Sequence, residues 1–131
     1  MIRADAVPTL LIDGIPARGR GRKKGDAMHV QVVTFELNGI TEEQFHEAAA
    51  ADAPTFATLP GLLGKMWLRD PETNTYGGVY LWADHEAYER YIEGEIFGAI
   101  KADRHLKNVE SRLFGVFEDL SSLTMPELRV A

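Results

Sequence analysis

The chain contains no cysteine in its 131 residues, which excludes disulfides, thiolate nucleophiles and zinc–thiolate sites. No apolar run approaches the roughly 18 residues that a membrane-spanning helix needs. Residues 7–15 are the longest early candidate, but Pro8, Asp13 and Gly14 interrupt them and no small-residue cleavage pattern follows, so they make a poor signal peptide. We therefore expect a cytoplasmic protein without a membrane partner.

Cofactor and metal motifs are also missing. The four histidines form no metal-binding spacing. Gly77 and Gly78 fall inside a predicted strand, and the glycines between Arg18 and Gly25 precede no strand–helix crossover of the kind that a phosphate-binding loop requires. There is no haem, flavin or nicotinamide fingerprint either. The sequence therefore predicts no cofactor and no metal site.

Charge is distributed unevenly along the chain. Residues 1–27 hold six of the 14 Lys and Arg residues but three of the 20 acids, which leaves the rest with a net charge of −9. An acidic body repels nucleic-acid phosphate, so we expect no nucleic-acid partner for it. The glycine-interleaved basic run Arg18–Gly25 predicts a disordered leader over residues 1–27. This leader is either a nucleic-acid-binding or localisation tail, or an upstream extension of a chain that starts at Met28.

What the chain does contain is about one domain's worth of strand and helix signals. Residues 28–37 are rich in β-formers and end at the turn pair Asn38-Gly39, so they predict the first strand. Thr41-Glu-Glu-Gln44 has the form of a capping box, which begins a helix. Pro54 interrupts the apolar face of that helix, and we expect a kink or a restart there.

Residues 62–69 predict a second strand, with Lys65 and Trp67 on one face and Met66 and Leu68 on the other. Turn chemistry follows directly after it, in Asp70-Pro-Glu-Thr-Asn74. The second strand should therefore form a hairpin with the third.

The stretch from Tyr76 to Tyr91 predicts a strand that leads directly into a helix. Val79 and Leu81 point to one face of the strand, and Tyr80 and Trp82 point to the other. Because both faces are apolar, this strand should lie in the middle of a sheet.

The second helix should begin after Asp84, which can cap it, and run from His85 to Arg104. A glycine costs a helix on the order of 1 kcal/mol relative to alanine, so we expect a weak point at Gly94 or Gly98. Residues 109–117 predict the fourth strand.

The element order is then βαββαβ, the ferredoxin-like arrangement of the α+β class, with a four-stranded antiparallel sheet and both helices on one side. Val79 and Leu81 would make the other side of the sheet apolar, too large a patch for a soluble monomer. We therefore expect a homodimer that closes sheet on sheet. The domain should span residues 28–120, and a tail over residues 121–131 needs a covering surface.

Four short segments carry a recognisable pattern at their spacing in the chain: Pro60-Gly61-Leu62-Leu63, Lys65-Met66-Trp67, Gly77-Gly78-Val79-Tyr80-Leu81 and Leu113-Phe114-Gly115-Val116-Phe117. With these segments the chain resembles the YdhR-type monooxygenases of the dimeric α+β barrel superfamily over roughly residues 28–123. The resemblance implies a dimeric α+β barrel with monooxygenase activity.

The third strand and second helix also resemble the cofactor-independent, quinone-forming monooxygenases of antibiotic biosynthesis. In those enzymes a pocket Trp ends the strand and a pocket Tyr follows six residues later, and Trp82 and Tyr88 match this pair. Their Asn four residues before the Trp is replaced here by Gly78, and Arg104 is an approximate counterpart of their helix-terminal Arg. The resemblance implies a small aromatic substrate and no cofactor.

Two interpretations of the aromatic residues remain open. Trp82 and Tyr88 suit a pocket for an aromatic substrate, because rings stack and the indole N–H and phenol O–H can hold an oxygen, but both could equally be core residues. Trp67 and Tyr80 could extend the same wall or belong to the core.

A base is needed to deprotonate a phenol or enol, whose carbanion would then reduce dioxygen itself. His105 follows the second helix, and Asp52 is an acid on an apolar stripe, although it could instead cap a segment restarted by Pro54. We interpret Lys65 and Arg69 as solvated strand residues, with anion binding as the alternative. The candidate catalytic residues are Trp82, Tyr88, Asp52 and His105, and the candidate substrate-binding residues are Trp67, Tyr80 and Arg104.

The first functional hypothesis is a cofactor-independent monooxygenase acting on an aromatic or polyketide-like compound. The second is an isomerase, cyclase or lyase that uses the same enolising pocket without oxygen. The third is a non-catalytic ligand-binding or stress-related dimer.

Overall fold

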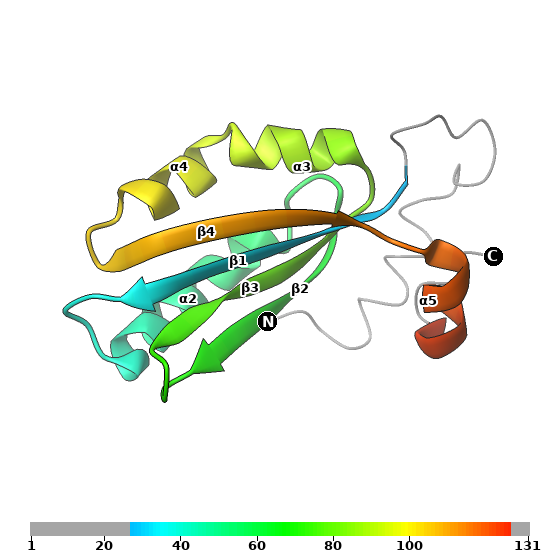
Figure 1. Ribbon diagram of the computed structural model, residues 1–131. Coiled ribbons are helices and arrows are strands. Elements are labelled where there is room, and N and C mark those ends of the chain that lie inside the picture. Colours follow the sequence, from blue (N-terminus) through cyan, green and yellow to red (C-terminus); the bar gives the residue numbers. More distant parts are fainter. Residues whose placement is uncertain (1–26, 127–131) are drawn as a thin grey trace.

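A four-stranded antiparallel sheet is the centre of the computed structural model, which describes residues 27–126 (Figure 1). Its strands lie in the order β2-β3-β1-β4. The strands are β1 (His29–Leu37), β2 (Leu62–Asp70), β3 (Thr75–Trp82) and β4 (Leu106–Gly115), and the helices are α2 (Glu42–Phe56), α3 (His85–Ile92), α4 (Glu95–Ala102) and α5 (Glu118–Thr124). The predicted ferredoxin-like βαββαβ order and α+β class are confirmed. The leader predicted for residues 1–27 lies outside the described residues except for its last position, and so do residues 127–131 of the tail.

The first helix, α2, begins as its capping box predicts. Thr41 Oγ1 accepts a hydrogen bond from the Gln44 amide at 3.0 Å, and Gln44 Oε1 accepts one from the Thr41 amide at 2.9 Å. The helix then continues through Pro54 to Phe56, so the predicted restart is wrong. Proline is tolerated because the carbonyl it leaves without an amide partner belongs to Ala50, an exposed residue near the end of the helix.

The connection between β3 and β4 contains two helices, α3 and α4, which are separated at Gly94. Asp84 caps α3 as predicted, its Oδ1 accepting a hydrogen bond from the Ala87 amide at 2.8 Å. Gly94 has extended backbone and occupies the N-cap of α4, which confirms the predicted weak point. Both helices and α2 lie over one face of the sheet (Figure 1).

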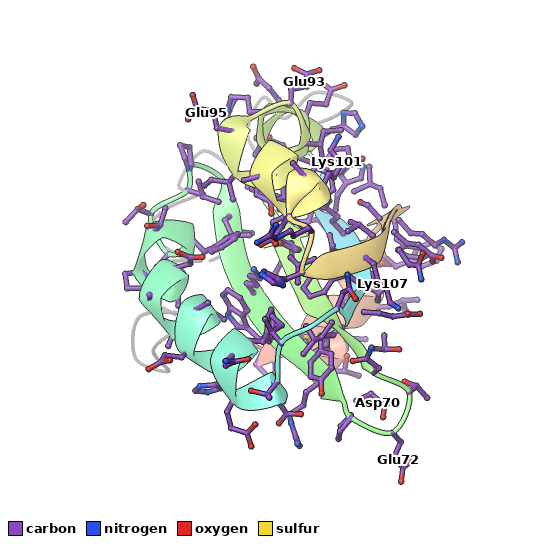
Figure 2. The ribbon with its side chains drawn as sticks, turned by 90° about the vertical axis from the view of Figure 1, so that its left-hand side faces the viewer. Asp70, Glu72, Glu93, Glu95, Lys101 and Lys107 are labelled. Atoms are coloured by element: carbon purple, nitrogen blue, oxygen red, sulfur yellow. The ribbon has the colours of Figure 1, made fainter. Side chains whose placement is uncertain are left out.

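The core lies between this face and the helices. Along β1 the odd-numbered residues Gln31, Val33, Phe35 and Leu37 are buried, while the residues between them are half-buried. This period of two places one set of side chains under the helices and the other on the opposite face. Charged side chains such as Glu93, Glu95 and Lys101 point outward from the periphery instead (Figure 2).

The opposite face of the sheet, called here the open face, carries apolar side chains on all four strands. Cross-strand pairing aligns Val30 with Leu81 and Phe114, and Val79 with Met66. Met66 is 63% exposed and Phe114 is 41% exposed, so this face is left uncovered where they lie.

Two features differ from the sequence-based expectation at the C-terminal side. Strand β4 begins at Leu106, earlier than predicted, across an irregularity in its pairing with β1 between Thr34 and Glu36. Helix α5 was not predicted, because it has only seven residues and its N-cap, Phe117, makes no side-chain capping hydrogen bond. None of the helices in the described part of the chain is long and apolar enough to span a membrane.

Candidate active site

Five aromatic rings from four elements meet between the sheet and the helices, and are called here the aromatic cluster. They are Phe56 of α2, Trp67 of β2, Tyr80 and Trp82 of β3, and Tyr91 of α3. The rings of Tyr80 and Trp82 stack with centroids 5.9 Å apart, and Tyr91 lies 5.1 Å from Tyr80 and 5.2 Å from Trp82. Phe56 meets Trp67 edge to face at 5.3 Å.

Lys65 of β2 extends into this aromatic cluster. Its Nζ lies 3.4 Å from the ring centroid of Trp67, 3.5 Å from that of Phe56 and 4.5 Å from that of Tyr80. The residue is 8% exposed, and within residues 27–126 its ammonium makes no hydrogen bond and no ion pair. The interpretation of Lys65 as a solvated residue is therefore wrong.

Burial sets the ionisation of Lys65. Loss of hydration lowers the pKa of its amine to about 7, and the negative charge of Asp52 opposes this shift. The ring faces around Nζ favour the charged form by cation–π attraction. Lys65 can therefore hold or release a proton near neutral pH.

The backbone explains why a lysine fits here. Pairing between β2 and β3 places Lys65 opposite Tyr80 and Trp67 opposite Gly78. A Cβ added at Gly78 would lie 2.8 Å from Lys65 Cε, so the missing side chain provides the space that the lysine stem occupies. Because β2 is an edge strand and Trp67 is only half-buried, this end of the aromatic cluster adjoins solvent.

Hydrogen bonds tie the inner end of the cluster together. Trp82 Nε1 donates to Gln31 Oε1 at 3.0 Å, and Gln31 Nε2 donates to Ser111 Oγ at 2.9 Å. The hydroxyls of Tyr80 and Tyr91 are 2.8 Å apart. Burial raises the pKa of Tyr80 and raises that of Tyr91 to about 12, so both phenols are neutral at physiological pH.

The structure places the predicted pair Trp82 and Tyr88 in the same core, but in different surroundings. Trp82 is 1% exposed, whereas Tyr88 is partly buried and meets the ring of His85 at 5.5 Å. The α3 ring that contacts Trp82 is Tyr91. Trp67 and Tyr80, predicted to bind substrate, both lie in the aromatic cluster.

The other predicted residues divide into two groups. Asp52 is exposed on α2 and lies near enough to Lys65 for its charge to affect the amine. His105 Nδ1 lies 3.0 Å from the Asn38 carbonyl, and the exposed Arg104 accepts a hydrogen bond from Asn38 through its own carbonyl. Asn38 follows the end of β1, roughly 20 Å along the strand from the row that contains Lys65. His105 and Arg104 are therefore not brought together with Lys65.

Sequence reasoning missed Lys65, Phe56, Tyr91 and Gln31 as members of this site. A signal was available for Lys65, because strand alternation placed it on the same face as Trp67. The burial of Lys65 depends on how α2 covers the edge of the sheet, and no local sequence pattern predicts that packing.

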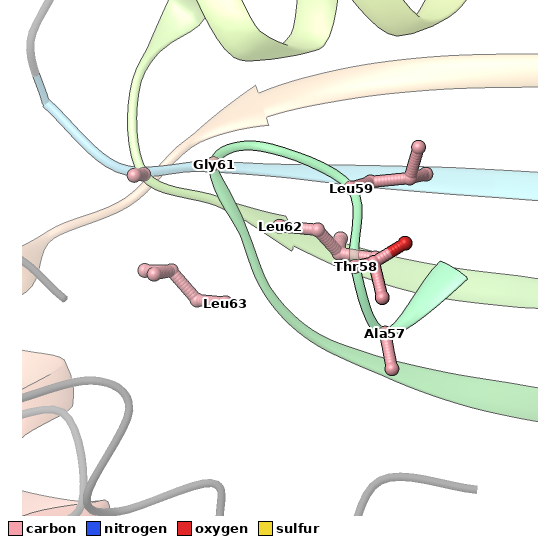
Figure 3. A pocket seen from close by; sticks show the side chains of 7 residues that line it. Ala57, Thr58, Leu59, Gly61, Leu62 and Leu63 are labelled. Carbon is pink, nitrogen blue, oxygen red and sulfur yellow. The ribbon is translucent and has the colours of Figure 1, made fainter. Parts of the chain in front are cut away.

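A separate hollow of about 220 Å³ lies beside the loop between α2 and β2 (Figure 3). No titratable side chain lines it, so it offers no group for acid–base chemistry. Its lining residues are Ala57, Thr58, Leu59, Gly61, Leu62, Leu63 and Ala83.

The described residues bring together no group of three or more His, Cys, Asp or Glu side chains that could hold a metal ion.

In sequence, residues 30–126 match the model of the family described as "Putative mono-oxygenase ydhR". The chain belongs to the ydhR family. This confirms the family expected from the sequence. No curated protein matches the chain in sequence.

Solved structures share the fold of this ydhR family member. SnoaB from Streptomyces nogalater, a cofactor-independent oxygenase, is 28% identical with a TM-score of 0.57, covering 69% of this chain and 93% of its own. The haem degrader MhuD from Mycobacterium tuberculosis, solved with two haems bound, is 22% identical with a TM-score of 0.56, covering 68% of this chain and 95% of its own. A protein of unknown function from Nitrosomonas europaea is 18% identical with a TM-score of 0.60, covering 71% and 92%. The likenesses to MhuD and to the Nitrosomonas europaea protein show a shared fold and nothing further.

Proposed function

We propose that this chain is a cofactor-independent monooxygenase that oxidises an aromatic or polyketide-like compound with dioxygen. The observation that carries the proposal is the aromatic cluster, which reaches solvent at the half-buried Trp67. Flat aromatic substrates stack on such rings. Membership of the ydhR family and the likeness to a cofactor-independent oxygenase at 28% identity support the same reaction class.

In this reaction the substrate supplies the electrons. An enol or phenol that loses its proton becomes an electron-rich carbanion, which transfers an electron to dioxygen and then forms a carbon–oxygen bond. Loss of water from the resulting hydroperoxide leaves a ketone or quinone, so one oxygen atom enters the product and the other leaves as water. The tasks of the protein are to bind the ring, remove the proton and stabilise the oxyanion.

We also propose that the active form is a homodimer joined through the open face. Val30, Val79, Leu81 and Phe114 form apolar rows on this face, and Met66 beside them is 63% exposed. Contiguous apolar surface of this kind is typical of a protein interface. A second copy presents the same strands, so apolar rows meet apolar rows across a two-fold axis.

Oxygen uptake with a panel of anthrones, naphthols and other electron-rich phenols tests the activity. We expect uptake and the entry of one ¹⁸O atom from ¹⁸O₂ into the product, measured by mass spectrometry.

Two variants of Trp67 test the role of the ring. Trp67→Phe, which keeps a ring, should retain most turnover, and Trp67→Ala should lose at least about tenfold in kcat/KM. Equal turnover without oxygen would instead indicate an isomerase, cyclase or lyase, and a bound but unchanged compound would indicate a ligand-binding protein.

A further inference from the structure

We propose that Lys65 accepts the proton of an enol or phenol substrate and that its ammonium then holds the resulting oxyanion. This assignment rests on the proposed function and deepens it, because it names the base and the acidic group of the substrate. The Lys65 amine lies among aromatic rings, is buried, and meets no acceptor within residues 27–126.

Among the residues that the structure describes, the buried amine of Lys65 has no hydrogen-bond acceptor. An ammonium has three N–H donors, yet within residues 27–126 the Lys65 Nζ meets ring faces and no oxygen. Burying such a group without a partner is costly, and a methionine would fill the same space without that cost. A negatively charged oxygen on the ligand would supply the missing acceptor and form a charge-assisted hydrogen bond.

The rings around Lys65 also select the ligand. Trp67 and Phe56 lie within 3.5 Å of Nζ by their centroids, and Trp67 is the member of the aromatic cluster that adjoins solvent. A planar ring that stacks beside Trp67 places its hydroxyl next to the amine. The site therefore favours an aromatic hydroxyl or an enol conjugated to a ring over an aliphatic alcohol.

The groups that face Lys65 allow its amine to gain and lose a proton near neutral pH. Among residues 27–126, Asp52 of α2 is the charged group whose field acts on the amine. Tyr80 of β3, hydrogen-bonded to Tyr91 of α3, presents a neutral phenol. Burial outweighs Asp52 and holds the lysine pKa at about 7. A base that titrates near the working pH is the most effective one.

The proton transfer balances without any further reactant. The substrate O–H bond breaks, its proton forms a new N–H bond on Lys65, and the electron pair stays on the substrate oxygen. The neutral amine and neutral hydroxyl thus become an ammonium and an oxyanion in contact. The proton returns to solvent when the oxidised product leaves.

Binding of 4-nitrophenol under anaerobic conditions tests this assignment directly, because its phenolate absorbs visible light and its phenol does not. At a pH where the free probe is mostly neutral, we expect wild-type protein to bind it as phenolate. Lys65→Met should bind at least about tenfold less of it in that form, a loss of 1.4 kcal/mol or more. Lys101→Met is the matched control, since Lys101 also lies beside a ring, Phe97 at 5.2 Å, but is exposed on α4 (Figure 2).

A second variant leaves the lysine present and moves it. A Cβ at position 78 would lie 2.8 Å from Lys65 Cε, so Gly78→Ala should displace the amine. The chain has five lysines, whose side chains can be labelled with ¹³C. Their spectrum should show one titration near pH 7. This titration should disappear in Lys65→Met and move to higher pH in Gly78→Ala.

The outcomes separate this assignment from the proposed function. Any of three results would overturn the assignment. They are phenolate formation in Lys65→Met equal to that in wild type, no phenolate in wild type, and a Lys65 signal that titrates only above pH 9. A protein that ionises the probe through Lys65 but consumes no dioxygen with any enol or phenol keeps the assignment and loses the monooxygenase function. Lys65→Arg completes the test, because it retains the cation and cannot accept a proton. It should hold probe that has already lost its proton to solvent, but lose turnover of a neutral enol or phenol.

Discussion

Lys65 defines the candidate site although, in the described part of the chain, its amine has no hydrogen-bonding partner. Three ring faces surround its amine, and Gly78 provides the space for its stem. Gly78 is also the position at which the quinone-forming enzymes that the sequence resembles carry an asparagine. Here a lysine from the neighbouring strand occupies that space and presents a donor of its own.

Stability should depend on pH through Lys65. The lysine pKa is 10.5 in the unfolded chain and about 7 in the folded one, so between these values the unfolded state binds more protons and the free energy of unfolding rises with pH. We expect a gain of roughly 2–3 kcal/mol from pH 6 to pH 9. Urea denaturation at both pH values measures it.

Lys65→Met should remove this gain and be the more stable variant at pH 6, because no buried cation remains. Lys101→Met, which changes an exposed lysine, should keep the gain. An equal rise with pH in wild type and in Lys65→Met would show that Lys65 remains charged inside the protein.

Local patterns predicted which side chains point inward better than they predicted which rings meet. Alternation along β2 and β3 correctly placed Lys65 and Trp67 together and Tyr80 and Trp82 together. Helical spacing allowed either Tyr88 or Tyr91 to approach Trp82. The choice of Tyr91 depends on how α3 is rotated against the sheet, which is a property of packing.

At the scale of elements, the loop between α2 and β2 is fixed closely against the start of α3. Gly61 has φ +80°, and a Cβ there would lie 2.3 Å from the Cβ of Ala87. The Gly61 carbonyl accepts a hydrogen bond from the Ala83 amide at 2.8 Å. This contact sets where β2 begins and therefore where Lys65 falls in the register.

Gly61→Ala should lower the free energy of unfolding by roughly 2–4 kcal/mol, because it combines a left-handed backbone with a steric clash. Gly98→Ala is the contrasting variant, since Gly98 lies in α4 and a Cβ there meets nothing within 4 Å. It should raise the free energy of unfolding by about 0.5–1 kcal/mol. Urea denaturation of both variants checks the pair, and an unaffected Gly61→Ala would contradict the account of the loop.

The elements with strong local signals were the predictable ones. The capping box of α2, the cap at Asp84 and the break at Gly94 were all readable from the sequence, and so was the β2–β3 hairpin. Helix α5 and the early start of β4 lack such signals. Their positions follow from long-range pairing with β1 and from packing near Met28, whose amide donates to Glu118 at 2.8 Å.

At the scale of the whole molecule, α2, α3 and α4 cover one face of the sheet, while Met66 and Phe114 are exposed on the open face. Exposed apolar side chains also occur on the segment that contains α5, where Phe117 is 77% exposed and Leu123 is 70% exposed. A surface of this kind is what a homodimer would bury.

Met66→Glu should therefore produce a monomer. The side chain is 63% exposed in the single chain, so a glutamate costs the monomer little, but an unpaired charge in the middle of an apolar interface is strongly unfavourable. Size-exclusion chromatography with light scattering should show the change. Ala51→Glu, which adds the same charge on an exposed position of α2, should leave the dimer intact, and a wild-type protein that is already monomeric at micromolar concentration would contradict the proposal.

The two tryptophans of the chain occupy contrasting positions, and this has an optical consequence. Trp82 is 1% exposed and held by Gln31, whereas the ring of Trp67 lies 3.4 Å from the Lys65 Nζ. Indole fluorescence responds to a positive charge nearby, so the emission of Trp67 should change when Lys65 loses its proton while that of Trp82 stays constant. The unlabelled protein thus contains both a sensor and an internal standard for the charge at its candidate site.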